Sequence, residues 1–386
     1  MKLRQAVVLF IDMAMLIIYV LVGIVTVAAG VKLHKMFRLF TLPQSWQFKE
    51  LPIDELPSVS LCIPARNETH AMTECLERAL SSTYPKLEII VLDDGSRDDT
   101  SMLIKSFAHA GVRFVEGKPL PQDWLGKNYA LHNLAREASG TFLLFADVDT
   151  RFKPQSISRI VDYTLREKVD MTSILPLRAD GHRLSVLFAT LRQFWSIVFH
   201  ATTHPAVASN AWLVRRSVVI EKMNSLEEAR LAIRPEVLVA KHLSSTKSYR
   251  FLISSVLLGV SYEKKWSSQV ETSLRLAFPL LGCSLLWSML VAVGLACMVV
   301  PFAGMLTALL DQDMGLFGVS TLLVVAELAV YGYYLSHIWQ RGWTAGLFLL
   351  PIILLQEASL VVISAYLYVR GRVTWKGRAI RNVTAR

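Results

Sequence analysis

The sequence has little charge for its length. Only 19% of its 386 residues are charged, 53% are hydrophobic, and the mean hydropathy is +0.40. An ordinary soluble domain carries about 25% charged residues. The composition therefore excludes an ordinary soluble enzyme and predicts a protein with membrane-embedded segments.

The sequence also lacks recognisable metal-binding or redox patterns among its cysteines and histidines. The four cysteines, with no motif spacing, are Cys62, Cys75, Cys283 and Cys297. We expect no disulfide between the first two, because we place them in the reducing cytoplasm. His200 and His204 have the i, i+4 spacing of some zinc sites but no third ligand nearby in the sequence, so a zinc site is disfavoured.

The apolar residues gather in runs near the two ends. Residues 13–31 form an uncharged run long enough to cross a bilayer, and no small-residue cleavage site follows it, which disfavours a cleavable signal peptide. Three further runs lie near 276–303, 316–335 and 344–369. These runs predict four parts, which are an anchor at 1–38, a catalytic domain at 39–270, C-terminal transmembrane helices at 271–369 and a basic tail at 370–386.

The net charge of +10 does not indicate nucleic-acid binding, because the basic residues cluster beside the apolar runs. One cluster follows the first run, and the tail from 370 onward has no acidic residue, so both are expected in the cytoplasm. A cytoplasmic domain and a cytoplasmic tail need an even number of crossings between them, yet three runs intervene. Either one run lies in the interface or re-enters, or the charge rule misleads. A further segment, 184–204, is interpreted as an interfacial helix of the catalytic domain.

The middle of the chain alternates strand-like and helical segments. Strands are expected at 59–64, 87–92, 111–116 and 141–146, and helices near 70–82 and 127–138. This alternation predicts an α/β domain with a mostly parallel sheet and ligands at the carboxyl ends of its strands. Carboxylates occur at two of those ends.

The first pair of carboxylates is Asp147 and Asp149, which follow the strand at 141–146 with one residue between them. Hard oxygen ligands at this spacing suit Mg²⁺ or Mn²⁺, and such an ion would neutralise charge on a departing nucleotide diphosphate. A solvated Asp-rich turn is the alternative for an isolated pair of this kind.

The second pair is Asp93 and Asp94, which end the strand at 87–92 and precede Gly95. A carboxylate there can accept hydrogen bonds from a uracil N–H or ribose hydroxyls, although alone the pattern is also an ordinary turn. Gly126 and Lys127 at a helix start are typical of a phosphate contact, or of a glycine cap followed by a surface lysine.

Four motifs in this order resemble the inverting family 2 glycosyltransferases of GT-A fold, which is a Rossmann-like α/β fold. They are Cys62-Ile63-Pro64-Ala65-Arg66-Asn67-Glu68, Val91-Leu92-Asp93-Asp94-Gly95-Ser96, Trp124-Leu125-Gly126-Lys127-Asn128 and Ala146-Asp147-Val148-Asp149. The flanking apolar runs and the terminal Val373-Thr374-Trp375-Lys376-Gly377-Arg378 resemble the membrane-bound branch, which includes hopanoid-associated, carotenoid and ceramide glycosyltransferases.

The resemblance implies roles for the residues of these motifs. Pro64, Arg66 and Glu68 would line the nucleotide pocket. Glu68 and Asp94 would lie near the uridine, and Asp93 would support their loop. Lys127 would contact the nucleotide or its phosphates, and Asp147 and Asp149 would hold the metal and the donor sugar.

The acceptor side departs from the family pattern. The stretch that corresponds to the family's catalytic Glu-Asp pair includes Asn210 and leads to Glu236, without such a pair. Glu236 is the candidate general base, and a surface glutamate after a proline is the alternative. In place of the Gln-x-x-Arg-Trp motif of processive synthases stand Tyr262, Lys265 and Trp266. Lysine cannot reproduce arginine's bidentate grip on a diphosphate, although Trp266 also suits an interfacial anchor.

These features predict an enzyme that moves a sugar from a nucleotide-sugar, a UDP-sugar by the resemblance, to a lipid or isoprenoid acceptor in the membrane. A processive polysaccharide synthase and a donor-binding scaffold that has lost its base are the alternatives. Glu327 and Glu357 lie inside apolar runs. Each is interpreted either as an acceptor contact or as a helix-packing residue.

Overall fold

The computed structural model describes residues 2–43, 45–49, 51–179, 191–264, 266–340 and 342–380. The chain divides into two compact units. Unit 1 takes in Met1–Arg38, Gly181–Val198 and Lys265–Gly371, and unit 2 takes in Leu39–Asp180, Phe199–Lys264 and Arg372–Arg386. The C-terminal segment therefore belongs to the same unit as the predicted catalytic domain.

Unit 2 is an α/β domain built on a seven-stranded sheet of order β3-β2-β1-β4-β8-β6-β9. Its strands are β1 Val59–Ala65, β2 Leu87–Asp93, β3 Val112–Glu116, β4 Phe142–Ala146, β6 Met171–Leu175, β8 Ala211–Arg215 and β9 Tyr249–Ile253. All neighbouring pairs are parallel except those of β8 with β4 and β6. The predicted GT-A-like, mostly parallel sheet is confirmed.

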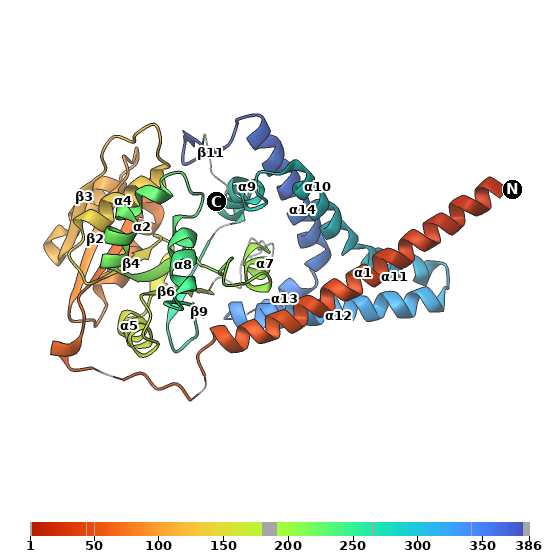
Figure 1. Ribbon diagram of the computed structural model, residues 1–386, viewed down its shortest axis with the longest axis horizontal. Helices are drawn as coiled ribbons and strands as arrows, with labels where there is room; N and C mark the ends of the chain where they lie inside the picture. The colour runs from red at the N-terminus through yellow and green to blue at the C-terminus, as the bar shows by residue number, and fades with distance from the viewer. Residues whose placement is uncertain are drawn as a thin grey trace. The chain divides into compact units, whose positions relative to one another are not determined.

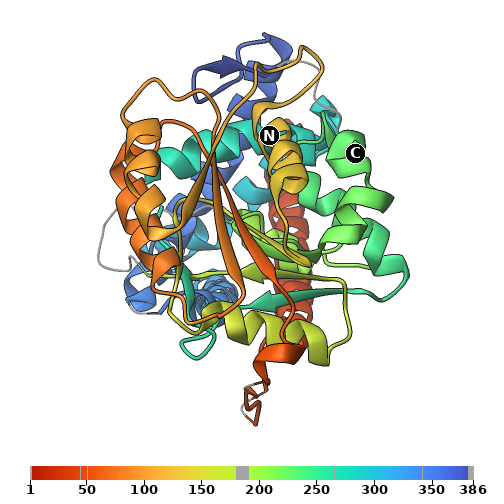
Figure 2. The same cartoon turned by 90° about the vertical axis from the view of Figure 1, so that its left-hand side faces the viewer.

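The helices of unit 2 alternate with the strands, as Figures 1 and 2 show. They are α2 Thr69–Leu80, α3 Thr100–Ser106, α4 Gly126–Glu137, α5 Ser156–Arg166 and α8 Pro235–Ser245. Leu61 and Ile63 of β1 join a core that includes Met72 and Leu76 of α2. Successive strand residues point to opposite faces of the sheet. The residues of β1 that alternate with Leu61 and Ile63 therefore face α4, which packs on β1 and β2.

Unit 2 also contains a small second sheet of order β5-β10-β7. It consists of β5 Thr150–Phe152, β7 Leu177–Arg178 and β10 Val260–Tyr262. β5 begins one residue after Asp149, so this sheet carries the segment that follows the predicted metal site. A two-stranded hairpin, β11 Thr374–Trp375 and β12 Arg378–Ala379, completes the unit.

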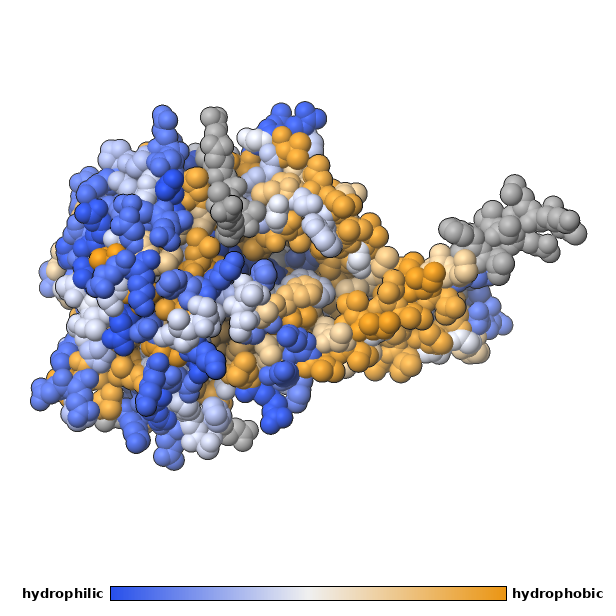
Figure 3. Space-filling view, viewed as in Figure 1, coloured by the Kyte–Doolittle hydropathy of each residue, from blue (hydrophilic) through white to orange (hydrophobic). Residues whose placement is uncertain are grey.

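Unit 1 is helical. Its helices are α1 Lys2–Phe40, which ends just inside unit 2, α7 Arg192–Val198, α9 Trp266–Leu280, α10 Leu285–Cys297, α11 Val300–Leu310, α12 Met314–Ile338, α13 Trp343–Leu347 and α14 Leu350–Val369. Four stretches of the described helices are long and apolar enough to cross a membrane: Asp12–Phe40, Leu285–Leu310, Met314–Ile338 and Leu350–Val369. One N-terminal and three C-terminal candidates match the prediction, and Figure 3 shows the orange, apolar surface of these helices.

The first C-terminal span begins later than the apolar run near 276–303 suggested. The chain breaks after α9, where Gly282 and Cys283 have positive φ of 70° and 55°. The side chain of Ser284 then accepts a hydrogen bond from the Trp287 N–H and caps α10. Apolar periodicity does not reveal such a break, because the residues at the turn are themselves apolar or small. Of the expected interfacial helix at 184–204, residues 184–190 lie outside the described residues, and α7 in unit 1 is the described helical part.

Helices α1 and α12 pack side by side and run in the same direction. The Tyr19 hydroxyl lies 2.7 Å from Ser320 Oγ, and His34 Nδ1 lies 3.2 Å from the Tyr333 hydroxyl. Residue numbers rise together in the two pairs, so the helices are parallel. α14 instead packs against α9 and α10. Figures 1 and 2 agree that it runs across α12 rather than along it.

Candidate functional site

The Asp147–Asp149 turn follows the fully buried strand β4. Asp147 N–H donates to the Asn210 carbonyl (3.0 Å), and the Thr150 hydroxyl donates to the same carbonyl (2.9 Å). Asn210 lies next to β8, which pairs with β4 so that Ala146 faces Ala211. The predicted acceptor-side residue Asn210 therefore lies at this turn, where its backbone holds the two carboxylates in place.

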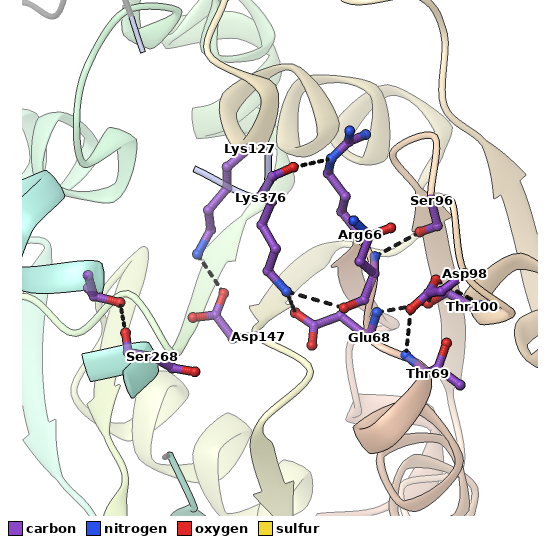
Figure 4. Close-up of polar contacts among 12 residues, drawn as sticks. Arg66, Glu68, Thr69, Ser96, Asp98, Thr100, Lys127, Asp147, Ser268 and Lys376 are labelled. Atoms are coloured by element: carbon purple, nitrogen blue, oxygen red, sulfur yellow. Dashed lines mark hydrogen bonds and ion pairs between the residues drawn. The ribbon is translucent and has the colours of Figure 1, made fainter. Parts of the chain in front are cut away.

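The hydrogen bonding of the Asp149 carboxyl is incomplete within the described residues. Its Oδ1 atom is buried and has no hydrogen-bond partner among the described residues. Burial raises the pKa of Asp149 to about 6, and Asp147 and Glu68 act in the same direction against Lys264 and Lys127. Lys127 Nζ lies 2.5 Å from Asp147 Oδ1 (Figure 4).

The two carboxylates fit a hard divalent ion such as Mg²⁺ or Mn²⁺. Among the described residues, no group of three or more His, Cys, Asp or Glu side chains could hold a metal. Asp147 and Asp149 together offer two carboxylate ligands for such an ion. This number of ligands suits an ion that also binds substrate phosphate oxygens and water, as Mg²⁺ usually does.

The loops after β1 and β2 lie at the same edge of the sheet as this turn, because β1, β2 and β4 are parallel. Pro64 is inside β1, and Arg66 follows the strand and donates through its guanidinium to the carbonyls of Asp94 and Gly95, the latter at 2.9 Å. Asp93 Oδ1 accepts from the Ser96 N–H (3.2 Å) and closes its own loop. The structure therefore joins the two predicted nucleotide loops through Arg66.

Two basic side chains from the far C-terminus enter these loops, and sequence reasoning did not place either of them in the site. Lys376 Nζ lies 2.8 Å from Glu68 Oε1, and Arg378 NH1 lies 2.6 Å from Asp94 Oδ2. Burial raises the pKa of the Asp94 carboxyl above its usual value, and the nearby Arg378 guanidinium opposes this rise without cancelling it. The signal available in the sequence was the terminal Trp375-Lys376-Gly377-Arg378 stretch, whose glycine is typical of the second position of a two-residue turn.

Glu236, the predicted base, begins α8 and is 1% exposed. It accepts a hydrogen bond from the Ser209 hydroxyl, and Arg234 Nε lies 3.1 Å from Glu236 Oε1. Ser209 directly precedes Asn210, so Glu236 is tied to the segment that holds the Asp147–Asp149 turn. The alternative of a surface glutamate is wrong, because the side chain is buried and paired.

The other predicted acceptor-side residues fall in different units or outside the described residues. Tyr262 of β10 pairs with Thr150 of β5, next to the metal-site turn. Lys265 lies outside the described residues. Trp266 begins α9 in unit 1 and donates from Nε1 to Gln356 Oε1 of α14 (2.9 Å), and its interpretation as an interfacial anchor stays a prediction. The neighbouring Lys264, which was not predicted as a site residue, is close enough to Asp149 to lower its pKa.

Comparison with known proteins agrees with this geometry. Residues 60–212 match the family model described as "Glycosyl transferase family 2". The chain is 34% identical over 119 residues to glycosyltransferase AglE of Haloferax volcanii, covering 30% of this chain and 38% of that one. It is 24% identical over 217 residues to an undecaprenyl-phosphate 4-deoxy-4-formamido-L-arabinose transferase of Pectobacterium atrosepticum, covering 52% and 65%. The alignments thus span less than two thirds of these relatives.

A solved structure resembles this chain over most of its length. It is the mannosyltransferase PcManGT from Pyrobaculum calidifontis in complex with GDP-mannose and Mn²⁺. The TM-score is 0.53 at 14% sequence identity, with 92% of this chain and 99% of that chain covered. At this identity the likeness concerns the fold alone, and it extends the agreement from the α/β domain to most of the chain.

Proposed function

We propose that this chain, whose residues 60–212 match the glycosyl transferase family 2 model, is a membrane-bound glycosyltransferase that transfers a sugar from a UDP-sugar to a lipid or isoprenoid acceptor, with inversion at the anomeric carbon. The observation that carries the proposal is the pair Asp147 and Asp149 at the end of buried β4, with an unpartnered buried oxygen on Asp149. The donor loops after β1 and β2 end at the same edge of the sheet.

The chemistry assigned to the residues follows from charge. Asp147 and Asp149 would hold Mg²⁺ or Mn²⁺. When bound, this ion offsets the negative charge that collects on the departing diphosphate. Lys127 contacts Asp147 and is placed to turn its ammonium to a phosphate oxygen. Arg66 keeps the two nucleotide loops together through the carbonyls of Asp94 and Gly95.

The transfer itself is a single displacement. The acceptor oxygen forms a bond to the anomeric carbon while the bond from that carbon to the diphosphate oxygen breaks, and the nucleoside diphosphate leaves with the electron pair. The proton of the acceptor hydroxyl goes to a general base, for which we propose Glu236. Ser209 and Arg234 fix its carboxylate at the chain segment that holds the metal-site turn.

A lipid acceptor is supported by the helices of unit 1. Four candidate spans accompany one catalytic-type domain, and one relative is named as a transferase to undecaprenyl phosphate. The basic residues in the last turns of α1 and after α14 favour a multi-pass cell-membrane protein whose catalytic domain faces the cytoplasm, where nucleotide-sugars are available. A processive synthase is less well supported, because Lys265 stands where the processive motif has arginine.

The test is donor turnover by the purified protein in nanodiscs, with UDP-sugars, a membrane lipid extract and Mn²⁺ or Mg²⁺. We expect metal-dependent UDP release and a new glycolipid with the wild type. Both products should be lost in Asp149→Ala, whereas Glu236→Gln should lose turnover but keep UDP binding. A wild type that binds UDP and transfers nothing under any condition would leave the scaffold interpretation instead. A ladder of products would identify a processive enzyme.

A further inference from the structure

The C-terminal hairpin contains an unfavourable turn. Its strands β11 and β12 pair so that Trp375 faces Arg378. The two residues between them, Lys376 and Gly377, have φ of 48° and 77°, the pattern of a two-residue type I′ turn. Glycine suits the second place, but asparagine, aspartate or glycine is preferred over lysine at the first. Contacts outside the turn must therefore offset its conformational cost.

Lys376 makes such contacts with the loop after β1 (Figure 4). Its ammonium lies 2.8 Å from Glu68 Oε1 and donates to the Asn67 carbonyl at 3.4 Å. Its own carbonyl accepts from Arg66 Nε at 3.3 Å. The turn is thereby fixed on the loop that the family resemblance assigns to the nucleotide.

Arg378 makes the corresponding contacts with the loop after β2. Its NH1 donates to Asp94 Oδ2 at 2.6 Å, and its NH2 donates to the Asp94 carbonyl at 3.3 Å. A Cβ atom placed on Gly126 would lie 2.7 Å from the same NH1. Arg378 therefore lies between the second nucleotide loop and the start of α4, which carries Lys127.

The charges around these loops explain why a donor site would need the hairpin. The site gathers five carboxylates, which are Glu68, Asp93, Asp94, Asp147 and Asp149, and an incoming nucleoside diphosphate is also an anion. Four basic side chains of the described residues form hydrogen bonds with these loops or with the Asp147–Asp149 turn, and they are Arg66, Lys127, Lys376 and Arg378. Two of these four come from the hairpin, so half of that positive charge is supplied by the last residues of the chain.

We infer that Lys376 and Arg378 bind the nucleoside diphosphate of the donor and that the hairpin is one wall of the donor site. Their side chains keep 25% and 28% exposure, and a guanidinium has five N–H donors, so both can reach phosphate oxygens while they hold Glu68 and Asp94. This inference rests on the proposed function, because it takes the loops after β1 and β2 to be the donor loops.

The experiment measures binding of UDP and of GDP with Mn²⁺ to the full-length protein in detergent, by calorimetry, without acceptor. The variants are Arg378→Ala and Lys376→Asn. Asparagine suits the first position of the turn, so this change removes the ammonium without disfavouring the hairpin. Arg372→Ala removes a charge from the same exposed tail outside the hairpin and is the matched control. Arg378→Lys keeps the charge but not the fork of donors.

We expect nucleotide affinity to fall about tenfold or more in Arg378→Ala and Lys376→Asn, the scale of a lost hydrogen bond to a charged group. Arg378→Lys should fall between wild type and alanine, and Arg372→Ala should match wild type. Unchanged affinity in Arg378→Ala and Lys376→Asn overturns the inference. Tighter binding in these variants also overturns it, because the hairpin would then compete with the nucleotide for the donor loops instead of binding it. A lower melting temperature of Arg378→Ala without nucleotide would mean that the change also destabilises the fold. In that case the nucleotide affinity of Lys376→Asn is the deciding measurement.

The result is separable from the proposed function. A wild type that binds nucleotide and transfers no sugar contradicts the function and leaves the hairpin assignment in place. A wild type that transfers sugar while Arg378→Ala and Lys376→Asn bind nucleotide normally contradicts the hairpin assignment alone.

Discussion

Asp98 is an exposed carboxylate that links the starts of two helices. It accepts hydrogen bonds from the Thr100 N–H and hydroxyl and from the Thr69 N–H at 3.3 Å (Figure 4). Partial desolvation would raise its pKa, but these hydrogen bonds outweigh that effect and lower the pKa to about 2. Asp98 therefore stabilises the fold in its ionised form, and it also supports the loops that carry Glu68 and Asp94.

We expect Asp98→Ala to lower the stability of the protein by about 1 kcal/mol near neutral pH, after discounting for exposure. Because the folded pKa is depressed, this contribution is full above the unfolded value of about 4 and is lost as pH falls toward about 2. Melting temperatures of wild type and variant, measured in detergent from about pH 6 to about pH 3, should therefore converge on acidification. A gap that stays constant or widens would contradict the assignment.

Gly126 gives a second test at the scale of one residue. An added Cβ would lie 2.7 Å from Arg378 NH1 and 3.2 Å from Asp94 Oδ2, so Arg378 must move. Gly126→Ala should weaken UDP binding several-fold, while the better helix propensity of alanine, worth about 0.5–1 kcal/mol, keeps the melting temperature near that of wild type. Calorimetry and a thermal scan check the two effects. A fall in stability without a change in affinity would contradict the placement of Arg378 in the donor site.

At the scale of elements, β1, β2 and β4 could be predicted from the sequence because each is a short, nearly continuous apolar run. Asp93 and Asp147 mark the ends of β2 and β4, and parallel strands bring such ends to one edge. The hairpin could not be placed in this way. The ion pair of Lys376 with Glu68 joins residues 308 apart in the chain, and nothing in local periodicity selects that partner. Likewise, Ser209 as the partner of Glu236 depends on antiparallel β8 beside β4.

Glu357 of α14 tests whether buried carboxylates in the helical unit serve packing or the acceptor. It is 8% exposed, and its carboxyl accepts a hydrogen bond from the Leu191 backbone N–H and lies near Arg192 at the start of α7. These contacts favour packing of α7 on α14. A glutamine can keep the hydrogen bond, and a leucine cannot.

We therefore expect Glu357→Gln to keep the wild-type melting temperature and acceptor KM. Glu357→Leu should cost about 1–3 kcal/mol, because a buried donor loses its acceptor. Thermal scans and initial rates with a lipid acceptor measure both. A raised acceptor KM in Glu357→Gln at unchanged melting temperature would instead make Glu357 an acceptor contact.

At the scale of the whole molecule, the described contacts bear on whether the number of membrane crossings after the catalytic domain is even or odd, which the sequence left open. Lys376 and Arg378 bond to loops of the catalytic-type domain, so we expect this part of the tail to lie on the same side of a membrane as those loops. The chain enters the domain from the C-terminal end of α1, and α12 is parallel to α1. If both helices cross a membrane, their C-terminal ends at Phe40 and Ile338 emerge on the same side.

We expect the span Leu285–Leu310 to cross away from the side on which α1 ends and α12 to return to it. On this arrangement α14 begins and ends on that side and makes no crossing of its own. Two further observations agree. α14 runs across α12 (Figures 1 and 2), and 39% of its apolar window is buried in the protein against 22% for each of the other three candidates. α14 is therefore expected to lie in the interface or to re-enter, and the basic Arg370 directly follows it.

Cysteine accessibility in intact cells tests this arrangement. In a Cys283→Ser, Cys297→Ser background, Gln312→Cys lies in the acidic turn between α11 and α12, whereas Gln340→Cys and Ala385→Cys lie before α13 and in the tail. We expect a membrane-impermeant maleimide to label Gln312→Cys from outside, and to label the other two only after permeabilisation. Labelling of Ala385→Cys from outside would make α14 a full crossing. It would also separate the tail from the donor loops, and the contacts of Lys376 and Arg378 could then not exist in the membrane.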